Sequence, residues 1–505
     1  MDLISTFQGI LTPDILGLIL LGTVLGMIFG AIPGLNTPIA IALVLPFTYS
    51  LAPLPSIALI MAVYMAGISG GLISAILLRI PGTVSSIATT LEGYPMAQSG
   101  RAAEALAIGT FSSFVGGMIS AVALLLLTPV LSKFALAFGP WEYLGTTFLA
   151  LSLVCTLMNG RMVKGVICVC LGLVIASIGI SPIDGTAMRL TFGTTALSNG
   201  FEMIALIVGA YAFPELFSIA GRLKEQVTPT QFRKKWFYLP RWSDLAGTLR
   251  TYIRSSIIGI GVGILPGMGP SVAGMAAYAQ TKKASKSPEA FGTGCVEGLV
   301  ASECANNAVT GGAIIPMLAL SVPGDSSTAV ILGALMIQGI QCGPLLVLRE
   351  PQLFQSVIII VFLANVFMFV IQTSTIRFSA RIIQIQRCFL LPAIVVFCSI
   401  GAFSINNRLF DVWSVLFFAV IGYILEKNDY PLMPLILAFV LGPMLEEYYR
   451  RTISYYGAFT NALSTFSVGT VLVVLGLLMT VWGFLRESPA VCKKMDSLLK
   501  RRKNG

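Results

Sequence analysis

The chain has 505 residues, of which 56% are apolar and 11% are charged, with a formal net charge of +10 and a mean hydropathy of +0.88. A soluble domain carries about 45–50% apolar and about 25% charged residues, so this composition excludes an ordinary soluble protein. Uncharged apolar stretches, such as 15–32, 121–130, 356–371 and 468–482, predict roughly 10–12 membrane spans of about 20 residues each. We therefore expect an all-α polytopic membrane protein.

The N-terminal region and the cysteines carry no processing or disulfide signal. No Lys or Arg precedes Arg79, so the basic start of a secretory signal is missing, and we expect the first span to be retained. The nine cysteines are an odd number, and Cys155 and Cys168 lie within apolar stretches. We expect them to pack as small apolar side chains.

Two glycine- and proline-rich interruptions lie in the first part of the chain. The segment GAIPGLNTP covers 30–38, and RIPGTVSS covers 79–86. Proline and glycine end helices, and non-helical backbone at membrane depth is tolerated only inside protein or beside a water-filled cavity. Peptide groups and hydroxyls exposed there suit a bound substrate. The candidate substrate-binding residues are Gly34, Asn36, Thr37, Gly82, Thr83, Ser85 and Ser86.

Two basic segments indicate membrane topology rather than nucleic-acid binding. Lys and Arg outnumber acidic residues in 222–255, and the tail at 486–505 is also basic. Positively charged loops favour the cytoplasmic side, so we expect both segments, and with them the C-terminus, to be cytoplasmic. The chain then divides into a first transmembrane half at 1–221, a basic linker at 222–255, a second half at 256–485 and the tail.

A third interruption, GILPGMGP at 263–270, lies between Arg250 and Arg254 on one side and a basic group at 282–286 on the other. If both basic groups are cytoplasmic, the segment enters the membrane and leaves by the same face as a re-entrant hairpin. A single kinked span is the alternative.

The interruptions occur in the same order in both halves. Pro33-Gly34 corresponds to Pro266-Gly267, and Pro81-Gly82 corresponds to Pro323-Gly324. Such self-similarity predicts an internal repeat, and two repeated halves with broken or re-entrant helices point to the binding site of a secondary transporter. The candidate substrate-binding residues of the second half are Gly267, Gly269, Gly324, Ser326 and Ser327.

A carboxylate and two carboxamides share one predicted helical face, because Glu303, Asn306 and Asn307 have i, i+3 and i+4 spacing. Buried polar groups are costly without partners. Here their oxygens suit a cation, and the amide groups suit a carboxylate. We expect all three residues to bind a cation, with Na⁺ as the one metal ion considered, and both asparagines to bind substrate. A hydrogen-bonded clamp between helices is the alternative.

These motifs are similar to those of one transporter family. The chain resembles the TctA-type large membrane subunit of the tripartite tricarboxylate transporters, from about residue 16 to residue 451. The segments that carry the resemblance are GAIPGLNT (30–37), GGLISAILLRIPG (70–82), LEGYPMAQSG (91–100), GVGILPGMGP (261–270), FGTG (291–294), EGLVASECANNAVTGGAIIP (297–316) and LSVPGDSST (320–328).

The resemblance implies a secondary active transporter that imports a tricarboxylate such as citrate, or a related organic acid, on a Na⁺ or H⁺ gradient and without a cofactor. It implies a bacterial inner-membrane location, with a small membrane subunit and a periplasmic solute-binding protein as partners besides membrane lipid. Alternating access would proceed by an elevator-like displacement of the re-entrant elements or by rocking.

The chain departs from the usual family pattern at several positions. Ser302 and Cys304 stand where the family usually has Pro and Ser, and Arg79 stands near a position that is usually polar and uncharged. Arg79 and Asp325 lie beside equivalent interruptions and are expected to tune substrate recognition. Arg79 is expected to contact a substrate carboxylate, or to form an internal salt bridge with Asp325 or Glu92.

Other functional classes fit less well. The chain has no G-x-x-x-x-G-K-[ST] segment for an ATP-driven pump. Without histidine or an obvious lysine, it has no base to activate a serine nucleophile at Ser69, so we do not expect an enzyme. An ion or solute channel built from duplicated re-entrant loops is the main alternative to a carrier.

Overall fold

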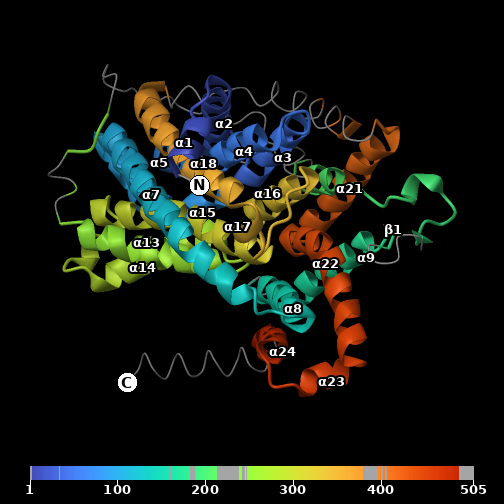
Figure 1. Ribbon diagram of the computed structural model, residues 1–505. Coiled ribbons are helices and arrows are strands. Elements are labelled where there is room, and N and C mark those ends of the chain that lie inside the picture. Colours follow the sequence, from blue (N-terminus) through green and yellow to red (C-terminus); the bar gives the residue numbers. More distant parts are fainter. Residues whose placement is uncertain are drawn as a thin grey trace, which may run out of the picture. The chain divides into compact units, whose positions relative to one another are not determined.

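The chain folds into two compact units, each built from two separate stretches of sequence. Unit 1 comprises Met1–Leu136 and Tyr211–Val412, and unit 2 comprises Ala137–Ala210 and Trp413–Gly505. Figure 1 colours the ribbon along the sequence and labels many of the helices and strand β1. The computed structural model describes residues 3–32, 35–157, 161–181, 188–212, 238–241, 245, 247–378, 396, 399, 402–403 and 407–487.

Long apolar helices dominate the described residues. Seven of the helical segments there are long and apolar enough to cross a membrane, and three shorter apolar helices accompany them. The seven are Pro13–Ala31, Pro53–Leu78, Thr89–Ala135, Pro351–Phe378, Leu409–Lys427, Leu432–Tyr456 and Val468–Glu487. The prediction of an all-α polytopic membrane protein is confirmed.

The first stretch of unit 1 is a series of helices that is interrupted twice. Proline in the first turn starts three of them, since proline lacks an N–H that would be unpaired there anyway. In chain order they are α1 (Leu3–Ile10), α2 (Pro13–Ala31), α3 (Thr37–Thr48), α4 (Pro53–Gly70), α5 (Leu72–Leu78), the 3₁₀ helix η1 (Val84–Ile87), α6 (Thr89–Met96), the π turn η2 (Ala97–Arg101) and α7 (Ala102–Ala135).

The second stretch of unit 1 is also interrupted twice. Its described elements are α13 (Leu249–Ile264), α14 (Gly269–Ala284), the 3₁₀ helix η5 (Pro288–Ala290), α15 (Val296–Leu320), α16 (Ser326–Ile337), α17 (Leu346–Arg349), α18 (Pro351–Thr375) and the 3₁₀ helix η6 (Ile376–Phe378).

Unit 2 combines helical pairs with one short hairpin of two antiparallel strands, β1 and β2. Its first stretch holds α8 (Pro140–Leu157), α9 (Met162–Ala176), β1 (Gly179–Ile180), β2 (Met188–Arg189), η3 (Thr195–Leu197), α10 (Met203–Ile207) and most of η4 (Val208–Ala212), whose last two residues belong to unit 1. The second stretch holds most of α21 (Leu409–Lys427), then α22 (Leu432–Tyr456), α23 (Phe459–Ser464) and α24 (Val468–Glu487).

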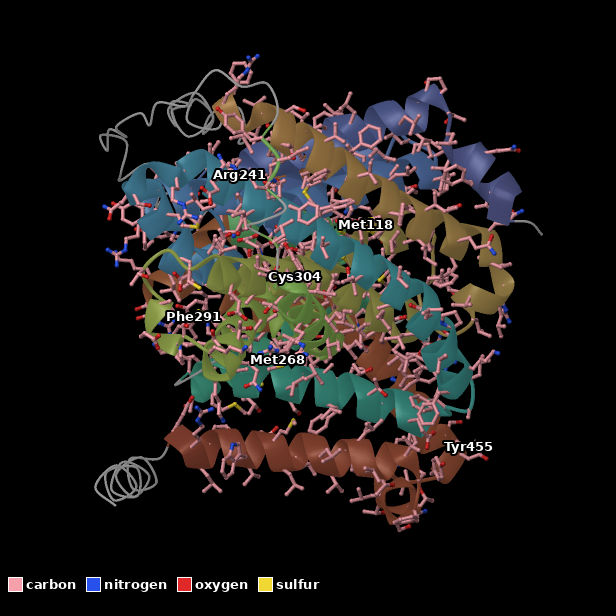
Figure 2. The ribbon with its side chains drawn as sticks, turned by 90° about the vertical axis from the view of Figure 1, so that its left-hand side faces the viewer. Met118, Arg241, Met268, Phe291, Cys304 and Tyr455 are labelled. Carbon is pink, nitrogen blue, oxygen red and sulfur yellow. The ribbon has the colours of Figure 1, made fainter. Side chains whose placement is uncertain are left out.

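The core of unit 1 is built around α15. Every residue from Gly298 to Ala319 is buried, and α15 packs against α7 and α13. A Cβ atom at Gly116 would lie 2.1 Å from the carbonyl oxygen of Cys304, and one at Gly311 would lie 2.5 Å from that of Ser120. Small residues allow helix backbones in membrane proteins to approach this closely. Figure 2 labels Cys304 among the closely packed helices of this unit.

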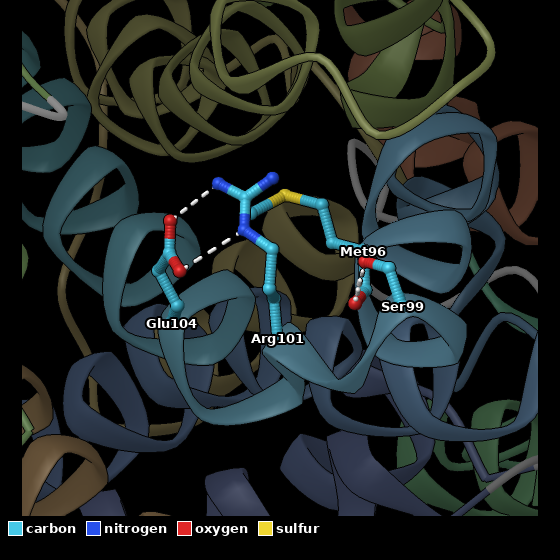
Figure 3. Close-up of polar contacts among 4 residues, drawn as sticks. All are labelled: Met96, Ser99, Arg101 and Glu104. Atoms are coloured by element: carbon cyan, nitrogen blue, oxygen red, sulfur yellow. Dashed lines mark hydrogen bonds and ion pairs between the residues drawn. The ribbon is translucent and has the colours of Figure 1, made fainter.

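A turn and an ion pair fix the start of α7. Gly100 has a φ of +80°, which glycine adopts readily, and the Ser99 hydroxyl donates to the carbonyl of Met96 at 2.8 Å. Arg101 donates to Glu104 at 2.5 Å from Nη2 and 3.0 Å from Nε (Figure 3). A carboxylate in the first turn also interacts favourably with the helix dipole.

Candidate functional site

All four predicted interruptions lie in unit 1, and the first separates α2 from α3. The Asn36 side chain caps α3 by accepting a hydrogen bond from the Ile39 amide at 3.1 Å. Thr37, the first residue of α3, is buried beside Gly67 of α4. The candidate Gly34 lies outside the described residues. Asn36 and Thr37 therefore mark the amino end of a short helix, where backbone N–H groups favour anions.

The second interruption separates α5 from η1. Gly82 leaves no room for a side chain, because a Cβ atom there would lie 2.2 Å from the carbonyl oxygen of Gly30. The Thr83 hydroxyl lies 2.7 Å from that of Ser85 and 3.0 Å from that of Ser86. All three hydroxyls are on buried side chains, so these predicted residues form one cluster.

The third interruption turns the chain back on itself between α13 and α14. Gly267 and Gly269 adopt φ values of +84° and +65°, which only glycine adopts readily. The two helices pack together, and the Arg254 guanidinium in α13 donates to the carbonyl of Gln280 in α14 at 3.5 Å. This is the helical hairpin that the re-entrant prediction requires. The alternative of one kinked span is wrong, because it would separate Arg254 from Gln280.

The fourth interruption separates α15 from α16. A Cβ atom at Gly324 would lie 2.3 Å from the carbonyl oxygen of Gly263, and the Gly324 carbonyl accepts from the Gly267 amide at 2.8 Å. Asp325 caps α16: its carboxylate accepts from the Thr328 amide at 2.7 Å, and the Thr328 hydroxyl accepts from the Asp325 amide at 2.9 Å. The third and fourth interruptions are thus bonded to each other.

Corresponding glycines make corresponding contacts in the two sequence halves. A Cβ atom at Gly26 of α2 would lie 2.4 Å from the carbonyl oxygen of Val63 in α4. One at Gly259 of α13 would lie 2.5 Å from that of Ala305 in α15. The glycines of the second and fourth interruptions likewise pack against the ends of α2 and α13.

The two halves also meet each other at the interruptions. The Tyr64 hydroxyl of α4 donates to the Asp325 carboxylate at 3.0 Å, and α3 packs against α16. The two serines that follow Asp325 begin α16, the first half-buried and the second buried. On the other side, a Cβ atom at Gly274 of α14 would lie 3.8 Å from the carbonyl oxygen of Ser85. The first interruption is thus near the fourth, and the second is near the third.

The three polar residues of α15 are fully enclosed but differently partnered. Glu303 accepts hydrogen bonds from the hydroxyl of Thr89 in α6 and from that of Ser113 in α7, the latter at 2.8 Å. Asn306 and Asn307 are equally buried, and neither side-chain amide has a hydrogen bond of normal geometry among the described residues; Asn306 contacts the Glu303 carboxylate of its own helix, and Asn307 has no such contact. A clamp between helices accounts for Glu303 but leaves both asparagines unexplained.

The chemistry of this group suits both ligands considered from the sequence. A buried amide without a partner costs about 1–3 kcal/mol, which a ligand that pairs with it recovers. The amide nitrogens can donate to a carboxylate, and the amide oxygens can accept a cation. The described ranges contain no group of three or more His, Cys, Asp or Glu side chains that could hold a metal ion. A cation at this place would therefore be bound by the Glu303 carboxylate together with amide and hydroxyl oxygens.

Comparison with known proteins identifies the family of the chain. A family model described as Tripartite tricarboxylate transporter TctA family matches residues 16–437. The chain belongs to this family. Membership in this family makes the chain a component of a membrane transporter. The family is part of a tripartite transport system, and membership points to a non-enzymatic role.

Two relatives of this TctA-family chain come from Agrobacterium vitis. One, an "uncharacterized 52.8 kDa protein in TAR-I ttuC' 3'region", is 33% identical over 503 residues, which cover 99% of each chain. The other, an "uncharacterized protein in TAR-II ttuC' 3'region", is 35% identical over 237 residues, which cover 47% of this chain and 97% of the relative. No solved structure matches this chain.

Arg79 does not form the internal salt bridge considered from the sequence. It ends α5 with a φ of +60°, is exposed, and lies over the ring of Tyr94 at 5.7 Å from the centroid. Neither Asp325 nor Glu92 pairs with it: Asp325 caps α16, and Glu92 is held by backbone amides. Substrate contact by Arg79 stays a prediction.

Glu92 has a role that the sequence did not reveal in this TctA-family protein. Its buried carboxylate accepts hydrogen bonds from the amides of Gly292, Gly294 and Cys295 at 2.5, 2.9 and 2.8 Å. The Tyr278 hydroxyl donates a fourth at 2.7 Å. Glu92 and the glycine-rich loop lie in two motifs of the family resemblance. The presence of both segments in family motifs was the one sequence signal for this contact. Their separation by about 200 residues gave no indication that they meet.

Proposed function

We propose that this chain is the large permease subunit of a binding-protein-dependent tripartite system that imports small carboxylates. The substrate is a tricarboxylate such as citrate or a related organic acid, and its import is coupled to a Na⁺ or H⁺ gradient. The protein acts in a bacterial inner membrane, with a cytoplasmic C-terminus. Its partners are a small membrane subunit and a periplasmic solute-binding protein. Membership in the TctA family supports this assignment.

The buried amides of Asn306 and Asn307 are the observation that carries the proposal, because Asn307 has no partner among the described residues and Asn306 contacts only Glu303 of its own helix. They lie in α15, where every residue from Gly298 to Ala319 is buried. Buried polar groups without partners are rare because they destabilise the folded state, so a functional reason is needed. A carboxylate bound between the interruptions would accept hydrogen bonds from these amides.

Glu303 is the proposed site of the coupling ion. Its carboxylate is buried and bonds to two hydroxyls, and no cationic side chain pairs with it among the described residues. An isolated buried charge is unfavourable, so binding of Na⁺ or H⁺ would stabilise this region. Ion binding and substrate binding one turn apart on α15 would then favour each other.

We also propose that the paired interruptions are an internal repeat and that they move together. Two pairs of glycines make corresponding contacts and so support the repeat: Gly26 corresponds to Gly259, and Gly82 corresponds to Gly324. Since all four interruptions belong to unit 1, that unit is the proposed carrier of the substrate during alternating access. An elevator-like displacement of unit 1 fits this better than rocking of one sequence half against the other, because unit 1 contains stretches of both halves.

Uptake by reconstituted liposomes tests the proposal. The full chain with its small subunit and binding protein is expected to accumulate citrate or a related acid on an imposed Na⁺ or H⁺ gradient, and the permease alone to transport little. Glu303→Gln and Asn306→Ala are expected to abolish uptake without loss of folded protein. Ser302→Ala is the matched control, since that hydroxyl bonds to the carbonyl of Leu299 in its own helix. Normal uptake by both site variants would refute the assignment.

The same liposomes separate a carrier from a channel. A carrier exchanges internal for external substrate, so preloaded unlabelled substrate is expected to accelerate entry of labelled substrate. Gradient-following flux without such acceleration would instead support the channel alternative.

A further inference from the structure

Unit 2 contains a cavity of about 590 Å³. Its lining differs in composition from the polar group of α15. Its walls come from α8, α9, α22, α23 and α24 and are almost entirely apolar; they include Leu144, Phe148, Leu173, Leu445, Val473 and Leu477. The volume lies within the roughly 300–1,000 Å³ of typical small-molecule sites. Most of this lining does not suit a small carboxylate, because apolar side chains cannot replace the hydration of its charges.

One end of the cavity carries charge. Arg189, on β2, donates from Nη1 to Glu446 at 2.6 Å, and Arg450 lies 3.1 Å from the same carboxylate oxygen. Two guanidinium groups thus share one carboxylate. The Nε–H of Arg189 is buried and has no hydrogen-bond partner among the described residues, although Arg189 lines the cavity. This end is therefore suited to an anion with oxygen acceptors.

The charged end combines Arg189 on β2 with Glu446 and Arg450 on α22. Met188, Leu190 and Phe192 on and after β2 are exposed, as expected for a segment that rests in the headgroup layer of a membrane. The cavity opens beside an apolar outer surface: Leu477 and Leu478 of α24 are 47% and 60% exposed. A charged end beside an apolar body matches the shape of a lipid.

We propose that this cavity binds one acyl chain of an anionic phospholipid, whose phosphate contacts Arg189. The phosphate oxygens accept from the Arg189 Nε–H, which has no hydrogen-bond partner among the described residues, and the two guanidinium groups at this end favour an anionic over a zwitterionic headgroup. The acyl chain of the lipid packs along Leu173 and Val473. A transmembrane helix of the small subunit, about 10–12 Å across, is too wide to enter and could cover only the mouth.

Photo-crosslinking tests this site in the purified full chain. The probe is phosphatidylglycerol with a photoreactive group in one acyl chain, offered in detergent micelles with either phosphatidylcholine or unlabelled phosphatidylglycerol as competitor. Crosslinks are expected to concentrate on the lining peptides of α9 and α24. Arg189→Gln is expected to weaken competition by phosphatidylglycerol roughly tenfold, the order for loss of one charge-assisted hydrogen bond. Leu477→Trp, which fills the mouth, is expected to abolish crosslinking.

Arg161→Gln is the matched control, because its exposed ion pair with Asp429 at 2.9 Å belongs to unit 2 but does not line the cavity. Even labelling of all outward-facing helices, or equal effects of Arg161→Gln and Arg189→Gln, would overturn the proposal. Competition by inorganic phosphate as strong as that by the lipid would reassign the site to a free anion. Loss of crosslinking on adding the small subunit, without release by excess phosphatidylglycerol, would reassign it to that subunit.

Discussion

Replacement of Glu92 by Gln tests how unit 1 holds its glycine-rich loop at 291–295. The Glu92 carboxylate accepts from Gly292 and Tyr278 at one oxygen and from Gly294 and Cys295 at the other. Glutamine keeps one acceptor oxygen and turns an NH₂ group toward the second pair of donors. Two hydrogen bonds to a charged group are therefore lost in Glu92→Gln.

The geometry sets the expected size of the effect. Two hydrogen bonds to a charged acceptor contribute about 1.5–3 kcal/mol each, or about 3–6 kcal/mol together. Gly292 is exposed and Gly294 is half-buried, so water can satisfy part of what is lost. We expect the loop to be destabilised by about 2–4 kcal/mol, which corresponds to roughly 30- to 800-fold easier opening.

Hydrogen–deuterium exchange measures this directly on the peptide that contains 292–295. Exchange at these amides is expected to accelerate in Glu92→Gln by the factor above. Glu104→Gln is the control, because Glu104 forms a partly exposed ion pair with Arg101 and such pairs contribute at most about 1 kcal/mol. Unchanged exchange in Glu92→Gln, or equal exchange in both variants, would show that the carboxylate does not hold the loop.

Three further substitutions follow from the site. Gly324→Ala is expected to lower the free energy of unfolding by about 1–3 kcal/mol in denaturant titration. Gly261→Ala is the control, because the space at its Cβ position is open and no such loss is expected. Equal stability of the two variants would contradict the close backbone contact at Gly324. Asn307→Ala is expected to lose uptake while its stability stays within about 1 kcal/mol of the parent, because the removed amide was unpaired; a large loss of stability would make Asn307 structural. Arg79→Gln is expected to leave thermal stability within about 0.5 kcal/mol, and a larger change would reveal a hidden partner of this exposed side chain.

Sequence patterns predicted the parts of this structure that depend on local composition. Long apolar stretches predicted the spanning helices, and proline and glycine predicted where α2, α5, α13 and α15 end. The spacing of Glu303, Asn306 and Asn307 predicted one buried helical face, which α15 provides. These features follow from helix geometry and from the cost of non-helical backbone in lipid.

Contacts between distant segments were beyond these patterns. Periodicity within one helix carries no information on which other helix it meets, so the bond of Tyr64 to Asp325 and the loop contacts of Glu92 could not be derived. The salt bridge considered for Arg79 was wrong for the same reason. Its partners were chosen by charge alone, but in the fold both carboxylates accept hydrogen bonds from backbone amides instead. The composition of unit 2 from two separate stretches was likewise not visible in the order of the helices.

The most direct test of the account is a structure of the full chain with a carboxylate that its own uptake assay identifies as substrate. We expect the carboxylate within hydrogen-bond distance of the Asn306 or Asn307 amide in unit 1, between the four interruptions. A substrate bound in unit 2, or in unit 1 with both asparagine amides still unpaired, would contradict the proposed site.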